Sequence, residues 1–145
     1  MNEKLYAELL MRLNLAHKEE FFLESSWLAY SILEDRLLSL LADSGGVKYK
    51  NHKPIRMMGK KLEEISKRSA TDGTLADCFP DQIASRIHEW KEQRNALVHT
   101  IEHGETTLSE MTKSAKRLSI DSKALVHDVS KAAKKLKSQR ADSAA

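Results

Sequence analysis

The sequence has few residues of the kinds that mark turn-rich, disulfide-linked or membrane-spanning proteins. Five glycines and two prolines disfavour a turn-rich β architecture and suit long helices. Cys78 is the single cysteine, which excludes an internal disulfide and favours a reducing compartment. No apolar run approaches the roughly 20 residues of a membrane span, and no apolar segment follows a basic N-terminal leader. We therefore expect a cytoplasmic protein with no membrane partner.

Charge is distributed unevenly along the chain. The formal net charge of +3 is too small to indicate a nucleic-acid partner without further support. Residues 105–145 carry nine Lys/Arg against five Asp/Glu, whereas residues 1–104 carry fifteen against sixteen. The basic excess therefore lies in the C-terminal third, where one face of a helix would either bind phosphates or be solvated.

Hydrophobic spacing predicts four main helices and a shorter one. The main helices are expected at residues 3–16, 18–42, 80–104 and 105–138, and the shorter helix at 55–68. Apolar residues surround the 18–42 helix, which is typical of the buried centre of a bundle. We expect an all-α, up-and-down bundle of four main helices plus one shorter helix. The chain length allows one such domain, at residues 1–138, followed by a frayed tail at 139–145.

Two segments have ambiguous patterns. Residues 69–79 are expected to form a loop, because Asp72-Gly73 is a turn signal. Residues 105–138 have heptad-like apolar spacing broken only at Ser122, which is consistent with one helix, a kinked helix or two helices.

Residues 80–104 contain the clearest helix boundaries and one contradiction. Pro80 suits a first helical turn, and Gly104 suits the left-handed conformation that ends helices. Apolar residues recur between them at three- and four-residue steps, at Ile83, Ile87, Trp90, Leu97 and Ile101. At about 100° per residue, Arg94 lies on the same face. Because burying an isolated guanidinium is costly, Arg94 must have a partner or a function.

Arg94 begins the string RNALVH, at residues 94–99. Asn95 and His99 are one turn apart, whereas Arg94 and His99 are separated by about 140° and about 7.5 Å. This RNxxxH string resembles the signature of the HEPN superfamily of small helical bundles, many of which are metal-independent ribonucleases acting as toxins or anti-phage effectors. The resemblance implies that Arg94, Asn95 and His99 form the catalytic site, usually across a homodimer. It departs from several branches of the superfamily at Thr100, where they place glycine.

The residue types suit metal-free RNA cleavage, in which the 2′-hydroxyl attacks the adjacent phosphorus. Histidine can transfer protons near neutral pH, and arginine can bind two phosphate oxygens. Asn95 would orient His99 or donate to a phosphate oxygen. One motif supplies few groups for the whole reaction, and two motifs across a twofold axis would supply more. We therefore expect RNA as substrate, no cofactor, and, from the resemblance, a partner such as a nucleotidyltransferase-fold antitoxin.

Two further sets of residues are predicted to assist. Glu34 on the 18–42 helix would form an ion pair with Arg94, unless it pairs within its own helix or lies at a solvated edge. The lysines of the 47–54 segment, Lys48, Lys50 and Lys53, are interleaved with an aromatic residue and would bind single-stranded RNA, unless this segment is a solvated connection.

Other interpretations remain open for the same residues. Arg94 alone could form a structural ion pair, and His99 could serve the helix dipole. The chain would then be a non-catalytic HEPN-like or helical binding and dimerisation module, or a coiled-coil adaptor built on residues 105–138. His99 and His103 are spaced for a metal, but no further ligand of a recognisable motif accompanies them, so no metal site is expected. No P-loop, dinucleotide fingerprint or nucleophile elbow is present.

Overall fold

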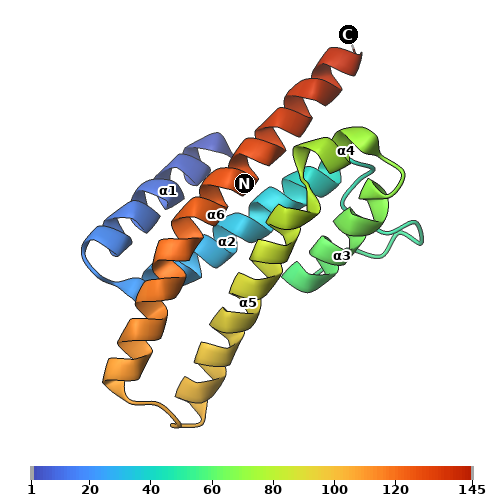
Figure 1. Cartoon of the computed structure of the whole chain (residues 1–145). Helices are drawn as coiled ribbons and strands as arrows, with labels where there is room; N and C mark the ends of the chain where they lie inside the picture. Colours follow the sequence, from blue (N-terminus) through green and yellow to red (C-terminus); the bar gives the residue numbers. More distant parts are fainter. Residues whose placement is uncertain (1, 145) are drawn as a thin grey trace.

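The computed structural model describes residues 2–144, and this part of the chain is all-α, as expected (Figure 1). Its six helices are α1 (Glu3–Lys18), α2 (Phe22–Ala42), α3 (Met58–Ser69), α4 (Gly73–Cys78), α5 (Asp81–Glu102) and α6 (Leu108–Ala144). None of these helices combines the length and the apolar character that crossing a bilayer would require.

The core lies between α2 and α6, which pack along one another through the centre of the molecule (Figure 1). α1 packs on α2, and α5 packs on α6 and α3. Fully buried aliphatic side chains from the two central helices fill the space between them, among them Ile32, Leu33, Leu37, Val129 and Leu136. Each contributes about 1.5–3 kcal/mol by leaving water, so this helix pair dominates the stability of the fold.

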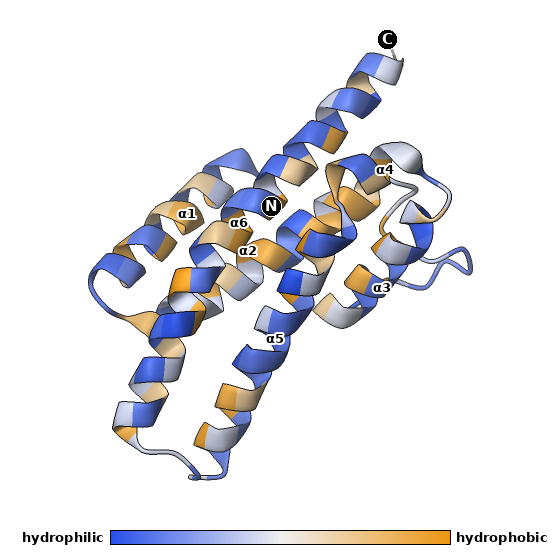
Figure 2. Cartoon of the chain, in the orientation of Figure 1, coloured by the Kyte–Doolittle hydropathy of each residue, from blue (hydrophilic) through white to orange (hydrophobic). Residues whose placement is uncertain are grey.

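One face of α2 remains open, contrary to the expectation of a helix buried all round. Trp27 is 69% exposed and Leu23 is 41% exposed. The reason is that α5 packs along α6 and α3 rather than over this face of α2. The last turns of α5 are also hydrophobic where the α5–α6 hairpin extends past the other helices (Figure 2).

Helix boundaries differ from expectation where tertiary contacts or backbone geometry intervene. Residues 19–21 separate α1 from α2, and Glu20 there has a left-handed φ of 63°. α3 begins at Met58 instead of residue 55, because Lys48 and Pro54 form a β-bridge and Met57 has a φ of 68°. At the other end of α5, Gly104 takes the expected left-handed conformation, with φ of 64°.

The expected loop at residues 69–79 contains the short helix α4. The Asp72 side chain accepts a hydrogen bond from the backbone N–H of Leu75 at 3.1 Å. Asp72 is therefore the N-cap of a helix and Gly73 its first residue, although the same dipeptide also occurs in turns.

α6 is one continuous helix, and its central serines are satisfied inside the core. The Ser119 hydroxyl lies 2.6 Å from the hydroxyl of Ser25 and 2.7 Å from Nδ1 of His17. Ser122 donates to the carbonyl of Ser119 at 2.8 Å. Because every one of these buried hydroxyls has a partner, the break in the heptad pattern does not interrupt the helix.

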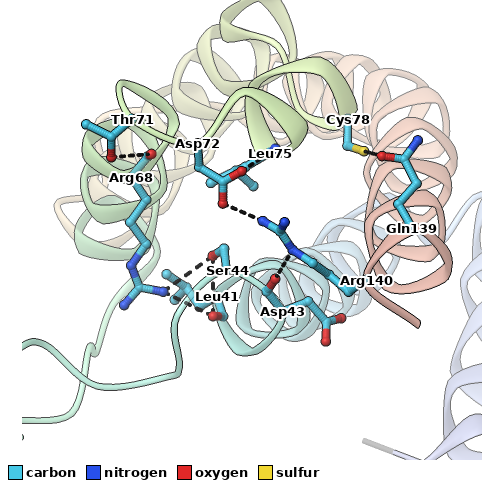
Figure 3. A network of polar contacts seen from close by, with 10 residues as sticks. All are labelled: Leu41, Asp43, Ser44, Arg68, Thr71, Asp72, Leu75, Cys78, Gln139 and Arg140. Atoms are coloured by element: carbon cyan, nitrogen blue, oxygen red, sulfur yellow. Dashed lines mark hydrogen bonds and ion pairs between the residues drawn. The ribbon is translucent and has the colours of Figure 1, made fainter. Parts of the chain in front are cut away.

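Residues 139–144 continue α6 instead of fraying, and Figure 3 shows the contacts responsible. Arg140 forms an ion pair with Asp72 and donates from Nε to the carbonyl of Asp43 at 2.9 Å. Gln139 accepts from the thiol of Cys78 at 3.6 Å. These contacts anchor the end of α6 to α4 and to the end of α2.

Candidate functional site

Arg94 lies half-buried on α5, where the helix passes α2. Its guanidinium carbon is 4.3 Å from the centroid of the Tyr30 ring on α2. The Tyr30 ring in turn lies 6.4 Å from the Trp90 ring, one turn before Arg94 on α5. An aromatic face attracts a cation by about 0.5–2 kcal/mol, so Tyr30 holds the guanidinium in place without neutralising its charge.

The expected ion pair between Glu34 and Arg94 is not formed. Glu34 instead accepts from the buried Nζ of Lys61 on α3, at 2.9 Å. Glu34 follows Tyr30 by one turn of α2 and faces α3, whereas Tyr30 faces α5. Tyr30, Glu34, Lys61, Trp90 and Arg94 are called the Tyr30 cluster below.

Burial and the neighbouring charges of the Tyr30 cluster change the pKa of the Tyr30 phenol. Burial raises the pKa of Tyr30 above its ordinary value, and the carboxylate of Glu34 raises it further, while Arg94 acts in the opposite direction. The phenol is therefore neutral near physiological pH, and it contributes a ring face to Arg94 instead of a counter-charge.

The outer side of Arg94 has few polar contacts. One of its terminal nitrogens donates to the side-chain oxygen of Asn95 at 3.3 Å. No carboxylate in residues 2–144 forms an ion pair with this guanidinium. Its positive charge therefore remains available to an anion at the surface of α5.

His99 is exposed in the last turn of α5 and packs edge-on against His103, with 4.2 Å between ring centroids. Asn95 bonds to Arg94 and not to His99. Among residues 2–144 no hydrogen bond joins the side chains of Arg94 and His99, whose side-chain contacts on α5 are with Asn95 and His103 respectively. Between residues 2 and 144, no third histidine, cysteine or carboxylate joins His99 and His103 in a metal-binding group.

The three lysines predicted to bind RNA lie in a different part of the molecule. Lys48, Lys50 and Lys53 are all exposed in a tight turn closed by a hydrogen bond from the backbone N–H of Tyr49 to the carbonyl of Lys53, at 2.9 Å. Figure 1 shows this turn projecting beyond α3, on the side away from α5. The fold therefore does not bring these lysines together with Arg94 and His99.

Cys78 is buried beside α6, and burial raises the pKa of its thiol. A thiol with a raised pKa is a weak nucleophile at neutral pH, which fits the structural position of Cys78.

Sequence reasoning predicted a role for Arg94 and did not single out its neighbours Tyr30 and Lys61. No local pattern marks Tyr30, because its role depends on how α2 and α5 cross. Lys61, which directly follows Lys60 in the sequence, likewise looks like part of a solvated helix face. No family model, curated protein or solved structure matches this chain.

Proposed function

We propose that this chain is a metal-independent RNA endonuclease of the HEPN type that acts as a homodimer. The main support for the proposal is the environment of Arg94. Its guanidinium lies against the Tyr30 ring without a carboxylate partner, and the exposed imidazole of His99 is on the same helix. A toxin or anti-phage role, restrained by a partner such as a nucleotidyltransferase-fold antitoxin, belongs to the same proposal.

In this proposal Arg94 binds the phosphate that is attacked, and Asn95 contributes a second donor beside it. Arginine suits this task because its planar group donates to two phosphate oxygens and stays charged. The 2′-oxygen forms a bond to phosphorus as the bond to the 5′-oxygen breaks, leaving a 2′,3′-cyclic phosphate and a 5′-hydroxyl. His99 transfers the proton that leaves the 2′-hydroxyl or the one that the 5′-oxygen gains.

Because Arg94 and His99 are apart in one subunit, the proposal pairs Arg94 of one subunit with His99 of the other. Exposed apolar side chains support a dimer through this face. Val98 and Ile101 are each 37% exposed, and they lie one and two turns from Arg94 on the same side of α5. Trp27 adds a 69% exposed indole one turn before Tyr30 on α2. A twofold interface would cover such residues.

The proposed architecture of each subunit is the four-helix, up-and-down bundle expected from the sequence, with α1, α2, α5 and α6 as its main helices. Two features are consistent with it. α1 and α2 are joined by residues 19–21, and α5 and α6 by residues 103–107, both short enough to connect antiparallel neighbours.

A non-catalytic dimerisation module is the second candidate. Its specific support is the packing of His99 against His103, which occupies one side of the proposed proton-transfer group. This candidate predicts the same dimer without RNA cleavage.

Cleavage of RNA by the purified full-length chain in EDTA tests the two candidates. We expect wild-type protein to cleave, and Arg94→Ala and His99→Ala to lose activity by about 100-fold or more while remaining folded dimers. Arg117→Ala and His88→Ala, exposed residues outside the motif, serve as matched controls and should retain activity. A wild-type dimer without cleavage, or a His99→Ala variant as active as wild type, would reject the nuclease and leave the binding module.

A further inference from the structure

A groove of about 990 Å³ runs between α1 and α6, and α2 contributes to its floor. Among the residues described, its apolar lining includes Leu10 and Leu13 from α1, Leu38 from α2 and Val126 from α6. Leu38 keeps 37% of its surface exposed there. The groove is separate from the Tyr30 cluster, because α1 and α5 lie on opposite sides of the α2–α6 pair (Figure 1).

The wall that α6 contributes is strongly basic. Lys123, Lys131, Lys134 and Lys137 all line the groove and are all exposed. None of the four forms an ion pair within the described part of the chain. From the first to the last they span about 21 Å at 1.5 Å per residue, or four helical turns.

Few carboxylates oppose these lysines across the groove. Glu3 lies on α1, and Asp35 on α2 is engaged by the neighbouring Arg36. The lining therefore has a clear excess of positive charge along one edge of an apolar floor, which is complementary to a partner that is acidic on its flanks and apolar on one face.

Contacts between helices hold the groove open in its present shape. The hydroxyl of Tyr6 on α1 lies 2.5 Å from that of Ser130 on α6. The guanidinium of Arg36 on α2 lies 4.5 Å from the centroid of the Tyr6 ring. Because these contacts fix α1 relative to α2 and α6, a ligand would not need to order the site on binding.

The arrangement of charge and apolar surface discriminates among anionic ligands. A lipid headgroup needs its cations gathered at one end of an acyl-chain site, whereas these lysines are spread over four turns. Single-stranded RNA needs several aromatic faces for base stacking, whereas the floor is aliphatic and the ring of Tyr6 is already covered by Arg36. An amphipathic helix needs an apolar floor with charges along its length, and this groove has both.

We propose that the α1–α2–α6 groove is a docking site for an acidic amphipathic helix of a partner protein. The helix would lay its apolar face on Leu10 and Leu38 and place its Glu or Asp residues beside the lysines of α6. The proposal does not depend on RNA cleavage, since none of the residues involved belongs to the Arg94 motif or to the Tyr30 cluster.

Binding of a fluorescein-labelled synthetic peptide to the full chain, followed by anisotropy, tests this site. The peptide has about 16 residues, with leucines at helical three- and four-residue spacing and glutamates on both flanks. A scrambled peptide of equal composition and a peptide with lysine in place of glutamate are the peptide controls. We expect saturable binding of the acidic amphipathic peptide only.

Two matched pairs of variants locate the binding. Lys131→Glu/Lys134→Glu should raise the dissociation constant of the acidic peptide at least about tenfold. Lys113→Glu/Lys116→Glu has the same spacing on an exposed part of α6 outside the groove, and it should leave the dissociation constant within about twofold of the wild-type value. Leu38→Asp should also weaken binding, whereas Met11→Asp, on an exposed part of α1 outside the lining, should not. All six positions keep at least a third of their surface exposed, so the variants should fold, which circular dichroism checks.

Four results would overturn the proposal. The first is that the scrambled peptide binds as tightly as the designed one, and the second is that both lysine pairs weaken peptide binding equally. The third is that Lys131→Glu/Lys134→Glu abolishes self-association of the chain. The fourth is that single-stranded RNA or phosphatidylglycerol vesicles, and not the peptide, bind in a way that these groove variants weaken. The third would assign the groove to a second copy of this chain, and the fourth to nucleic acid or lipid.

Discussion

At the scale of single residues, the most informative side chain is Arg94, whose neighbours determine what it can do. It is held by a ring face and an amide, through Tyr30 and Asn95, and not by a carboxylate. A carboxylate would bind the same donors that a phosphate needs, whereas an aromatic ring leaves them available. Glu34, which the sequence suggested as partner, stabilises Lys61 instead.

This arrangement makes Tyr30 a positioning residue in the proposed site, and we predict that its ring matters more than its hydroxyl. Tyr30→Phe should retain RNA cleavage, whereas Tyr30→Leu should lose roughly 2- to 30-fold, the equivalent of about 0.5–2 kcal/mol of cation–π attraction. Cleavage assays in EDTA, with urea unfolding of both variants, would separate activity from stability. Equal losses in the two variants would assign the effect to the hydroxyl, and an unimpaired Tyr30→Leu would show that the ring does not position Arg94.

At the scale of helices, the α5–α6 pair shows how polar contacts supplement apolar packing. The indole N–H of Trp90 donates to the carbonyl of Leu118 at 2.9 Å inside the core. One turn earlier on α5, Arg86 forms an ion pair with Asp128 at 2.7 Å on the surface. The hydrogen bond from Arg86 is the main reason that the pKa of Asp128 lies below its ordinary value, and His127 adds to it.

We predict that Arg86 stabilises the protein in a pH-dependent way. Because the folded-state pKa of Asp128 is lowered, the ionised carboxylate stabilises the folded protein fully at pH values above the ordinary pKa of an aspartate. This stabilisation is lost as the pH falls through the folded-state pKa of Asp128. The free energy of unfolding of Arg86→Ala should therefore be lower than that of wild type near neutral pH, and the difference should shrink in acid.

Urea unfolding over a series of pH values would measure this difference. The same comparison in a His127→Ala background removes the second side-chain contact of Asp128, so that only Arg86 acts on it. Arg117→Ala is the control for the loss of an exposed arginine. A difference between wild type and Arg86→Ala that stays constant from neutral pH into acid would contradict the assignment to Asp128.

At the scale of the whole molecule, the central α2–α6 pair separates two surfaces with different chemistry. α5 presents Arg94 and His99 on one side, and α1 borders the basic groove on the other (Figure 1). The two proposals can therefore be tested independently, because no residue that lines the groove belongs to the Arg94 motif or to the Tyr30 cluster.

The proposed sharing of the active site across a homodimer makes a quantitative prediction. In this proposal, a homodimer of Arg94→Ala lacks the guanidinium in both of its sites, and a homodimer of His99→Ala lacks the imidazole in both. In a mixed dimer one site contains both substitutions and the other contains neither. Random mixing forms about half mixed dimers with one intact site of two, so about a quarter of wild-type activity should return.

Mixing the two purified variants under conditions of subunit exchange, followed by the cleavage assay, would measure this recovery. His88→Ala mixed with Arg94→Ala is the control for dilution by an active partner. No recovery from two well-folded, exchanging variants would contradict the pairing of Arg94 with the other subunit's His99.

Local patterns in the chain were sufficient to predict an all-α protein and the approximate position of its five longer helices. The reason is that apolar spacing, capping residues and the left-handed Gly104 act within a few residues of one another. The same patterns exposed Arg94 as a cation on an apolar face. None of these inferences required knowledge of how the helices pack.

Packing between helices decided the rest. Tyr30 meets Arg94, and Glu34 turns to Lys61, only because of the way α2, α3 and α5 cross. Arg140 holds residues 139–144 in α6 through contacts with residues distant in sequence. The basic groove likewise arises where α1 and α6 lie beside each other, since side chains from separate helices become neighbours only when the hydrophobic core brings those helices together.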